Sequence, residues 1–279
     1  MAVEEAYTQD VQAILSHRYD NGADYWTTED KRLLKGSPFS AYNSALMLLE
    51  LGVEPDDPVL QKVAQLFLDA WRQDGRFRLY PGGAIYACHT TPAAYLLCRL
   101  GYAEDPRLQK TFGHLLKTRY TDGGWRCNKF SFGRGPETEY SNAWPTLVAL
   151  NAFRLSGFLN REPELDEAVE FLLRHWEIRR PIGPCHYGIG TRFMQVAYPF
   201  GDYNLFLYVY VLSFYDRAKD DRRFKEAFEA LRGKLVDGQV VVERVVPKLA
   251  KLHFCKKGEP SELATRRYHE ILKNLEREN

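Results

Sequence analysis

The chain has 279 residues, of which 45% are hydrophobic and 27% are charged, and its formal net charge is +1. This much apolar material is enough for a sizeable core, which excludes a mainly disordered chain. Because 38 basic side chains nearly balance 37 acidic ones, no net field would hold a polyanion, and we expect no nucleic-acid partner.

The usual signs of export and membrane insertion are missing from the sequence. The first residues are acidic, and the longest uncharged apolar stretch, 203–215, is shorter than the roughly 20 residues that span a bilayer. The five cysteines are scattered without CxxC spacing, which is typical of free thiols in a reducing compartment. We therefore expect a cytoplasmic protein without a transmembrane segment.

Apolar residues at helical spacing form pairs of segments along the chain. The first pair covers 41–52 and 58–70, and the next pair begins with 90–101. Gly52 and Gly101 end the first segment of each pair, as glycine commonly does after the last turn of a helix. The pattern predicts helices that are joined by short turns.

Two features of the first pair recur 48 residues later. Pro58, which follows an aspartate at a helix start, is matched by Pro106, and the loop that begins at Asp74 is matched by the loop that begins at Asp122. Less regular units begin near positions 143 and 202. The sequence therefore predicts an all-α fold that is built from four to five irregular helix-pair repeats.

The end of the chain departs from this pattern. Valines at 240–242 and 245–246 are the only strand signals, and they suggest one short hairpin. We expect residues 1–242 to form the helical domain, with a leader helix at its N-terminus. Residues 243–279 should form an extension that packs on this domain through an amphipathic helix capped by Ser261, and its basic side chains leave contact with a membrane surface open.

The loop Thr121-Asp-Gly-Gly-Trp-Arg-Cys-Asn-Lys129, with Pro136-Glu-Thr-Glu-Tyr-Ser141 after it, resembles the repeats of the terpenoid cyclase and protein prenyltransferase superfamily. The pair Cys88-His89, which leads into an apolar helix, is similar as well. The resemblance covers about residues 38 to 240. It implies an α/α toroid of inner and outer helices around an apolar cavity, isoprenoid chemistry, and bacterial relatives described only as prenyltransferase-like, without an established reaction.

The zinc ligands of protein prenyltransferases are not matched in this sequence. In their β subunits an Asp-x-Cys run precedes a Tyr-Ser pair, and a later inner helix adds a histidine, whereas this chain has Glu137-Thr138-Glu139 before Tyr140 and has Asn204 at the later position. If such an oxygen site binds a metal, it would prefer Mg²⁺, Mn²⁺ or Ca²⁺ over zinc. We expect no bound zinc, no required cofactor and no required partner subunit, and Mg²⁺ is the metal to test.

The acid of class II terpene cyclases is also not matched. Those enzymes protonate their substrate with an Asp-x-Asp-Asp run, which this chain lacks. The pairs Asp56-Asp57 and Asp220-Asp221 fall in turns before helices, and we expect them to supply helix caps.

Aligned repeats place Ser40, His89, Trp144 and Asp202 at equivalent starts of inner helices, where exposed N–H groups favour an anionic head group.

Under the enzyme hypothesis, Glu137 or Glu139 is the general acid, because burial of two neighbouring carboxyls raises the pKa of one, and His89 or Asp202 orients it. The substrate-binding candidates are Tyr140, Trp144, Tyr203, Asn204, Lys129, Arg134, Arg192 and the loop residue His186 at the mouth, with Tyr95, Trp125 and Tyr208 in the bore.

Three functions remain open from the sequence. The first is a prenyltransferase-like or terpene cyclase-like protein that holds an isoprenoid or similar elongated apolar ligand. The second is a non-catalytic binding or scaffold protein that has lost the metal and acid motifs. The third is a carbohydrate-active enzyme with paired carboxylates. In a plainer interpretation, the polar candidates cap their own helices and the aromatic ones fill the core.

Overall fold

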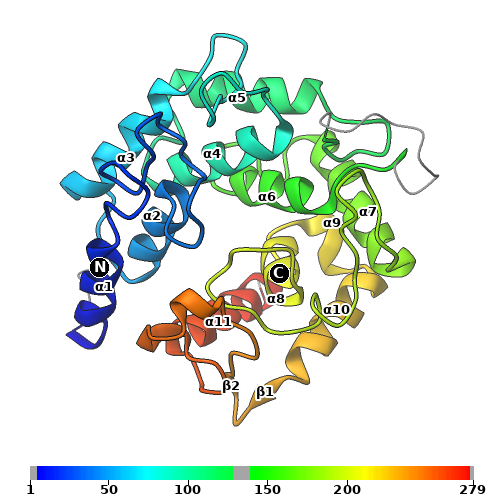
Figure 1. Cartoon of the computed structure of the whole chain (residues 1–279). Helices are drawn as coiled ribbons and strands as arrows, with labels where there is room; N and C mark the ends of the chain where they lie inside the picture. Colours follow the sequence, from blue (N-terminus) through cyan, green and yellow to red (C-terminus); the bar gives the residue numbers. More distant parts are fainter. Residues whose placement is uncertain (1–4, 128–138, 277–279) are drawn as a thin grey trace. The chain divides into compact units, whose positions relative to one another are not determined.

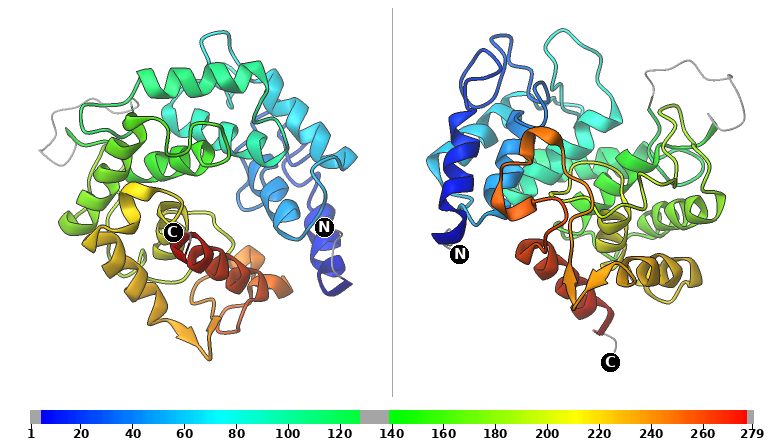
Figure 2. Two further views of the ribbon diagram at one scale, coloured as in Figure 1. Left: turned by 180° about the vertical axis from the view of Figure 1, so that it is seen from behind. Right: turned by 60° about the horizontal axis from the view of Figure 1, so that its bottom comes forward.

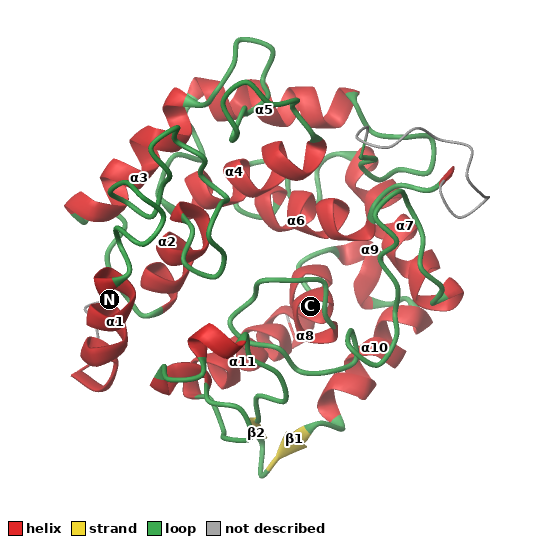
Figure 3. Ribbon diagram, viewed as in Figure 1, coloured by secondary structure: helices red, strands yellow, loops and turns green. Residues whose placement is uncertain are grey.

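The structure, a computed structural model, describes residues 5–127 and 139–276. Within these ranges the chain is all-α apart from one two-stranded sheet, as predicted (Figures 1 and 3). None of the helices found there combines the length and the hydropathy that are needed to cross a bilayer. The chain divides into two compact units, Met1–Lys117 with Val246–Phe254, and Thr118–Val245 with Cys255–Asn279. Within the predicted extension 243–279, residues 246–254 belong to the first unit and the remaining residues to the second.

In the first unit, α4 is the central helix and packs against α2, α3 and α5. The later segment of this unit is held by the buried carboxylate of Asp10, which accepts hydrogen bonds from the backbone N–H groups of His253 and Phe254, both at 2.9 Å. The helices of this unit are α1 (Thr8–Ser16), α2 (Ala41–Glu50), α3 (Pro58–Asp69), α4 (Ala87–Arg99) and α5 (Pro106–Lys117), with short 3-10 turns at Glu5–Tyr7 and Pro247–Leu249.

In the second unit, α8 contacts α6, α10 and α11, and α7 covers α6 (Figure 2). The elements are α6 (Ala143–Phe153), α7 (Pro163–Ile178), α8 (Leu205–Leu212), α9 (Asp216–Lys219), α10 (Arg222–Arg232), the strands β1 (Leu235–Val236) and β2 (Gln239–Val240), and α11 (Glu262–Glu276). A further 3-10 turn, His253–Cys255, lies where the chain passes from the first unit to the second.

Helices that are buried on every side alternate along the chain with helices that are buried on one side. All eight residues of α8 and ten of the eleven residues of α6 are buried, and α4 is also mostly buried. In α3, α5 and α10 the buried residues instead follow one helical face. A helix that is apolar all round requires partners on all sides, whereas a one-sided helix leaves its polar face to water.

The starts and ends of the helices follow the local signals in the sequence. The carboxylates of Asp57, Asp105 and Asp221 accept hydrogen bonds of 2.8, 2.8 and 2.9 Å from backbone N–H groups at the starts of α3, α5 and α10, which confirms the predicted caps at positions 57 and 221. Gly52 and Gly101 adopt left-handed conformations with φ of +88° and +89°, which glycine reaches without a Cβ clash.

The loops 72–77 and 120–125 are closed by equivalent hydrogen bonds. Each loop has a backbone N–H to carbonyl bond across its neck, of 2.9 Å in the first and 2.8 Å in the second. The backbone N–H of Phe77 then donates to the hydroxyl of Thr90 on α4, and that of Trp125 donates to the hydroxyl of Thr146 on α6. Each loop is thus fixed to the buried helix that follows it in the chain.

The hairpin predicted from valines 240–242 and 245–246 was placed too late in the chain. The strands are β1 and β2, which pair antiparallel with Leu235 opposite Val240. The turn between them is Asp237-Gly238, with positive φ of 50° and 76°, and this pair is a strong hairpin signal because both residues tolerate that conformation. The valines predicted strands further along the chain, whereas the Asp237-Gly238 turn determines where the strands pair. The predicted cap of the last helix is confirmed, since Ser261 Oγ accepts from the N–H of Ala264.

Candidate functional site

The start of α8 brings together three of the predicted site residues, Asp202, Tyr203 and Asn204. Asn204 is fully buried, and its Oδ1 accepts a hydrogen bond of 3.0 Å from the backbone N–H of Leu207. Its Nδ2 donates to the backbone oxygen of Asp202 at 3.0 Å. The side chain of Asn204 is therefore a helix cap, as the plainer interpretation of the sequence expected.

The carboxylate of Asp202 is bound by two arginines. Arg244 makes a bidentate contact, with Nη1–Oδ2 of 2.9 Å and Nη2–Oδ1 of 3.1 Å. Arg192, which is mostly exposed, lies 3.3 Å from Oδ2. Both carboxylate oxygens of Asp202 thus accept charge-assisted hydrogen bonds from guanidinium groups of the protein itself. Arg244 was not predicted, because it lies 42 residues further along the chain.

Tyr203 is paired with a histidine that the sequence analysis also missed, His175 of α7. Nε2 of His175 lies 3.2 Å from the carbonyl of Arg180, which can only accept, so this nitrogen carries the proton. Nδ1 therefore accepts the hydrogen bond of 2.9 Å from the Tyr203 hydroxyl. Burial lowers the pKa of His175 to about 4 and raises the pKa of Tyr203 well above its usual range, so both are neutral near pH 7. The helical spacing of His175 with Phe171 and Leu172 was the available signal for its burial.

The aromatic candidates of the second unit lie in its core. Tyr208 has no exposed surface and its hydroxyl donates to the carbonyl of Leu172 at 3.1 Å, while Trp125 is 1% exposed and stacks on Phe153. Phe193 bridges Tyr203 and Tyr208, with ring centroids 4.8 and 5.8 Å away. These side chains fill space and satisfy their polar atoms inside the protein, which is the plainer of the two roles expected for them.

At the start of α6, Tyr140 and Trp144 are half-buried and keep accessible surface. Glu139, the predicted acid, is instead 55% exposed at its side chain and lies 3.6 Å from the guanidinium of Arg126. The burial that was expected of a catalytic carboxyl is thus not present around Glu139. Three further candidates, Lys129, Arg134 and Glu137, lie outside the described residues.

The loop between α7 and α8 carries His186, which is exposed and has a left-handed backbone with φ of 52°. It is held by a pair of backbone hydrogen bonds between Ile182 and Tyr187, of 3.0 and 3.2 Å. Tyr187 in turn packs edge-on against Tyr203, with ring centroids 5.9 Å apart. The loop is thus an ordered hairpin that contacts the start of α8 through an aromatic side chain.

The two remaining candidates belong to the first unit. His89 is 8% exposed and lies between the rings of Tyr80 and Tyr86, with centroid distances of 5.2 and 5.1 Å. The hydroxyl of Tyr95 accepts a hydrogen bond of 3.1 Å from Arg99, further along α4. His89 and Tyr95 are thus residues of the first unit, whereas the candidates around α6 and α8 belong to the second.

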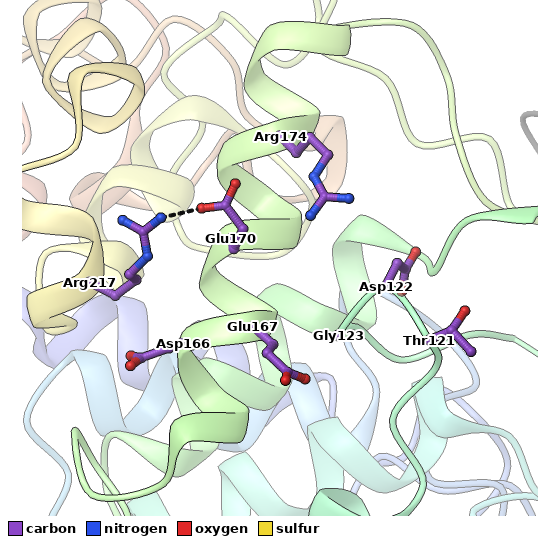
Figure 4. A pocket seen from close by; sticks show the side chains of 8 residues that line it. All are labelled: Thr121, Asp122, Gly123, Asp166, Glu167, Glu170, Arg174 and Arg217. Carbon is purple, nitrogen blue, oxygen red and sulfur yellow. Dashed lines mark hydrogen bonds and ion pairs between the residues drawn. The ribbon is translucent and has the colours of Figure 1, made fainter.

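A charged pocket of about 380 Å³ lies in the second unit, between the Thr121–Gly123 loop, α7 and α9 (Figure 4). Arg217 points to Glu170 and binds it at 2.5 Å, and the same carboxylate also receives two bonds of 2.8 Å from Arg223. The Asp122 carboxylate accepts from both the hydroxyl and the N–H of Ser141. The residues that line the pocket are Thr121, Asp122, Gly123, Asp166, Glu167, Glu170, Arg174 and Arg217.

In the part of the chain that the structure describes, no three His, Cys, Asp or Glu side chains form a group that could hold a metal ion. The oxygen site expected from Glu137, Glu139 and Asn204 includes a residue outside that part, and Asn204 is occupied as a cap. No model of a known protein family matches the chain, and no curated protein matches it either.

Proposed function

We propose that the chain is an α/α-toroid protein of the terpenoid cyclase and prenyltransferase kind, and that it binds an isoprenoid or similar elongated apolar ligand. In this proposal the buried helices α4, α6 and α8 are inner helices, α3, α5, α7 and α10 are outer helices, and four to five irregular repeats close into a ring.

The alternation of fully buried helices with one-sided helices carries the proposal. It is supported by the equivalent loops at 72–77 and 120–125, each of which ends on a threonine hydroxyl of the next buried helix. A helix that is apolar on every side must be surrounded by other helices. If every second helix of a chain of helix pairs is of this kind, a closed ring provides those neighbours.

The polar residues described around α6 and α8 favour a binding role over catalysis. Asp202 is neutralised by two arginines, Glu139 is exposed beside Arg126, and His175 is a neutral, doubly hydrogen-bonded side chain. These described groups are thus engaged with arginines or hydrogen-bonded inside the protein, and none of them is positioned as a general acid. A non-catalytic holder of an apolar ligand, with Trp144 and Tyr140 as its accessible aromatic surface, is therefore the form of the proposal that we favour.

A carbohydrate-active enzyme receives less support. The charged pocket beside α7 has four carboxylate residues, but Glu170 is bound by Arg217 and Arg223, and no aromatic side chain lines the pocket to stack on a sugar. Glycan cleavage requires a pair of carboxyls that are free to donate a proton and to attack or activate water.

The test is to incubate the full chain with farnesyl diphosphate, geranylgeranyl diphosphate and the corresponding alcohols. Binding would be followed by tryptophan fluorescence, and conversion by mass spectrometry of the extracted ligand. Saturable binding with unchanged ligand supports the holder, whereas a new product or released diphosphate would establish an enzyme. Absence of binding to all four compounds would refute the proposal in both forms.

A further inference from the structure

Among the five cysteines, all of which the structure describes, Cys185 is the exposed one, whereas Cys88 is half-buried and the others are buried. Cys185 lies in the hairpin between Ile182 and Tyr187. Gly183, with φ of +73°, helps to turn this hairpin and packs against the start of α6. The thiol is therefore accessible and is also held in a defined place.

The side chain of Asn142, directly before α6, contacts this thiol. Asn142 is fully buried, and its Nδ2 lies 3.1 Å from Sγ of Cys185. An amide N–H can only donate, so the sulfur is the acceptor, and a donated hydrogen bond favours the thiolate over the thiol. The first turn of an α-helix adds a positive dipole end, which acts in the same direction.

The other polar atom of Asn142 has no donor among the described residues. Its Oδ1 is buried, and a Cβ at Gly183 would come within 2.6 Å of it, so the backbone of the hairpin lies directly above this oxygen. A buried acceptor without a donor is unfavourable, and it fits a group that arrives with an O–H or N–H. The side chain thus offers a donor to sulfur and an acceptor to a group attached to sulfur.

We propose that Cys185 is a site of oxidative modification, at which a hydroperoxide converts the thiolate to a sulfenic acid that Asn142 stabilises. The sulfur attacks one peroxide oxygen, an S–O bond forms, and the O–O bond breaks. With hydrogen peroxide, the leaving hydroxide takes a proton from solvent to give water, so that sulfur is oxidised by two electrons and the peroxide is reduced. The new S–O–H then has Oδ1 of Asn142 as its acceptor. This inference does not depend on the proposed ligand.

The first experiment compares two exposed thiols in the full chain. The variant Cys185→Ser/Ser16→Cys moves the exposed thiol to the last residue of α1, where the negative end of a helix opposes ionisation. We expect iodoacetamide to alkylate Cys185 about five- to tenfold faster at pH 7 than the thiol at position 16, with a rate that reaches half its maximum at lower pH. Equal rates with equal pH profiles would overturn the proposal.

The second experiment tests the oxidation itself. The chain is treated with hydrogen peroxide in the presence of dimedone, and peptide mass spectrometry locates the adduct. We expect the adduct at Cys185, its loss in Cys185→Ser, and a several-fold lower yield in Asn142→Ala, with Asn142→Ser as the milder variant if the alanine form does not fold. Rapid alkylation of Cys185 without a dimedone adduct there would also overturn the proposal.

Discussion

The hydroxyl of Tyr203 donates a hydrogen bond of 2.9 Å to Nδ1 of His175, and the two rings stack with an interplanar angle of 12°. This buried pair links α7 to the residues that begin α8. The opposite nitrogen of the imidazole donates to the carbonyl of Arg180, and burial of the ring keeps the histidine neutral.

The pair makes stability depend on pH. Burial lowers the pKa of His175 to about 4, below the ~6.5 of an unfolded chain, so between these values the unfolded state binds more protons. The contribution of His175 to the free energy of unfolding should be fully present well above pH 6.5, fall by about 2 kcal/mol between pH 7 and pH 5, and level off below pH 4. Urea unfolding at several pH values measures this, and His175→Gln should remove that part of the pH dependence. An unchanged slope in this variant would contradict the assignment.

A second pH effect is expected at stronger acidity. Hydrogen bonds from Arg223 lower the pKa of Asp221 to about 2, so its stabilising contribution is present above pH 3.8 and is lost as the pH falls toward 2. Asp221→Asn keeps a helix cap but removes the charge, and it should cost about 1–2 kcal/mol at pH 7. Asp220→Asn is the matched control, because the side chain of Asp220 is 80% exposed. Thermal unfolding at pH 7 and pH 3 distinguishes them, and equal losses in both variants would argue against the buried pairing.

Two glycines with the same backbone conformation should tolerate a methyl group differently. Gly123 has φ of +91° and a Cβ there would lie 2.5 Å from the carbonyl oxygen of Glu167, whereas Gly101 has φ of +89° and no atom within 4 Å. Gly101→Ala should cost about 1 kcal/mol from backbone strain alone, and Gly123→Ala about 3 kcal/mol because the loop must also move away from α7. Denaturant midpoints provide the comparison. If the two alanine variants were equally stable, the close approach of the loop to α7 would be refuted.

The proposed ligand makes a prediction for Trp144. Its ring keeps accessible surface at the start of α6, so Trp144→Ala should weaken binding of geranylgeranyl alcohol or diphosphate about tenfold, through loss of aromatic contact. The control is Tyr19→Ala, which removes an aromatic side chain that is 65% exposed in the first unit. Isothermal titration calorimetry with variants of matched thermal stability gives the answer, and equal affinities would remove Trp144 from the site.

Features that depend on a few neighbouring residues could be predicted from the sequence. The caps at Asp57 and Asp221 and the glycine ends of α2 and α4 each involve residues within one or two turns, and these were predicted correctly. The misplaced hairpin shows the limit even of local reasoning. Asp237-Gly238 has the conformation of a tight turn, but the valines beyond it dominated the interpretation.

The candidate site was less predictable because its contacts join distant parts of the chain. Arg244, one of the two arginines that bind Asp202, lies 42 residues later, beyond the recognisable pattern of helix pairs, and no spacing rule links the two. Asn204 was identified as a site residue from its aligned position, yet the same position makes it a helix cap. Residue type and position in the repeat predicted where polar side chains gather. They did not predict which of these side chains already form hydrogen bonds or ion pairs within the protein.

The threonine bonds to Phe77 and Trp125 have a consequence for how the chain acquires its structure. Each loop is completed by a hydroxyl that arrives later in synthesis, on the next buried helix. A nascent chain that ends before Thr146 therefore holds an unfinished loop at 120–125, however well its earlier helices have formed. During synthesis, each of these two loops would then become fully hydrogen-bonded only after the next buried helix has left the ribosome.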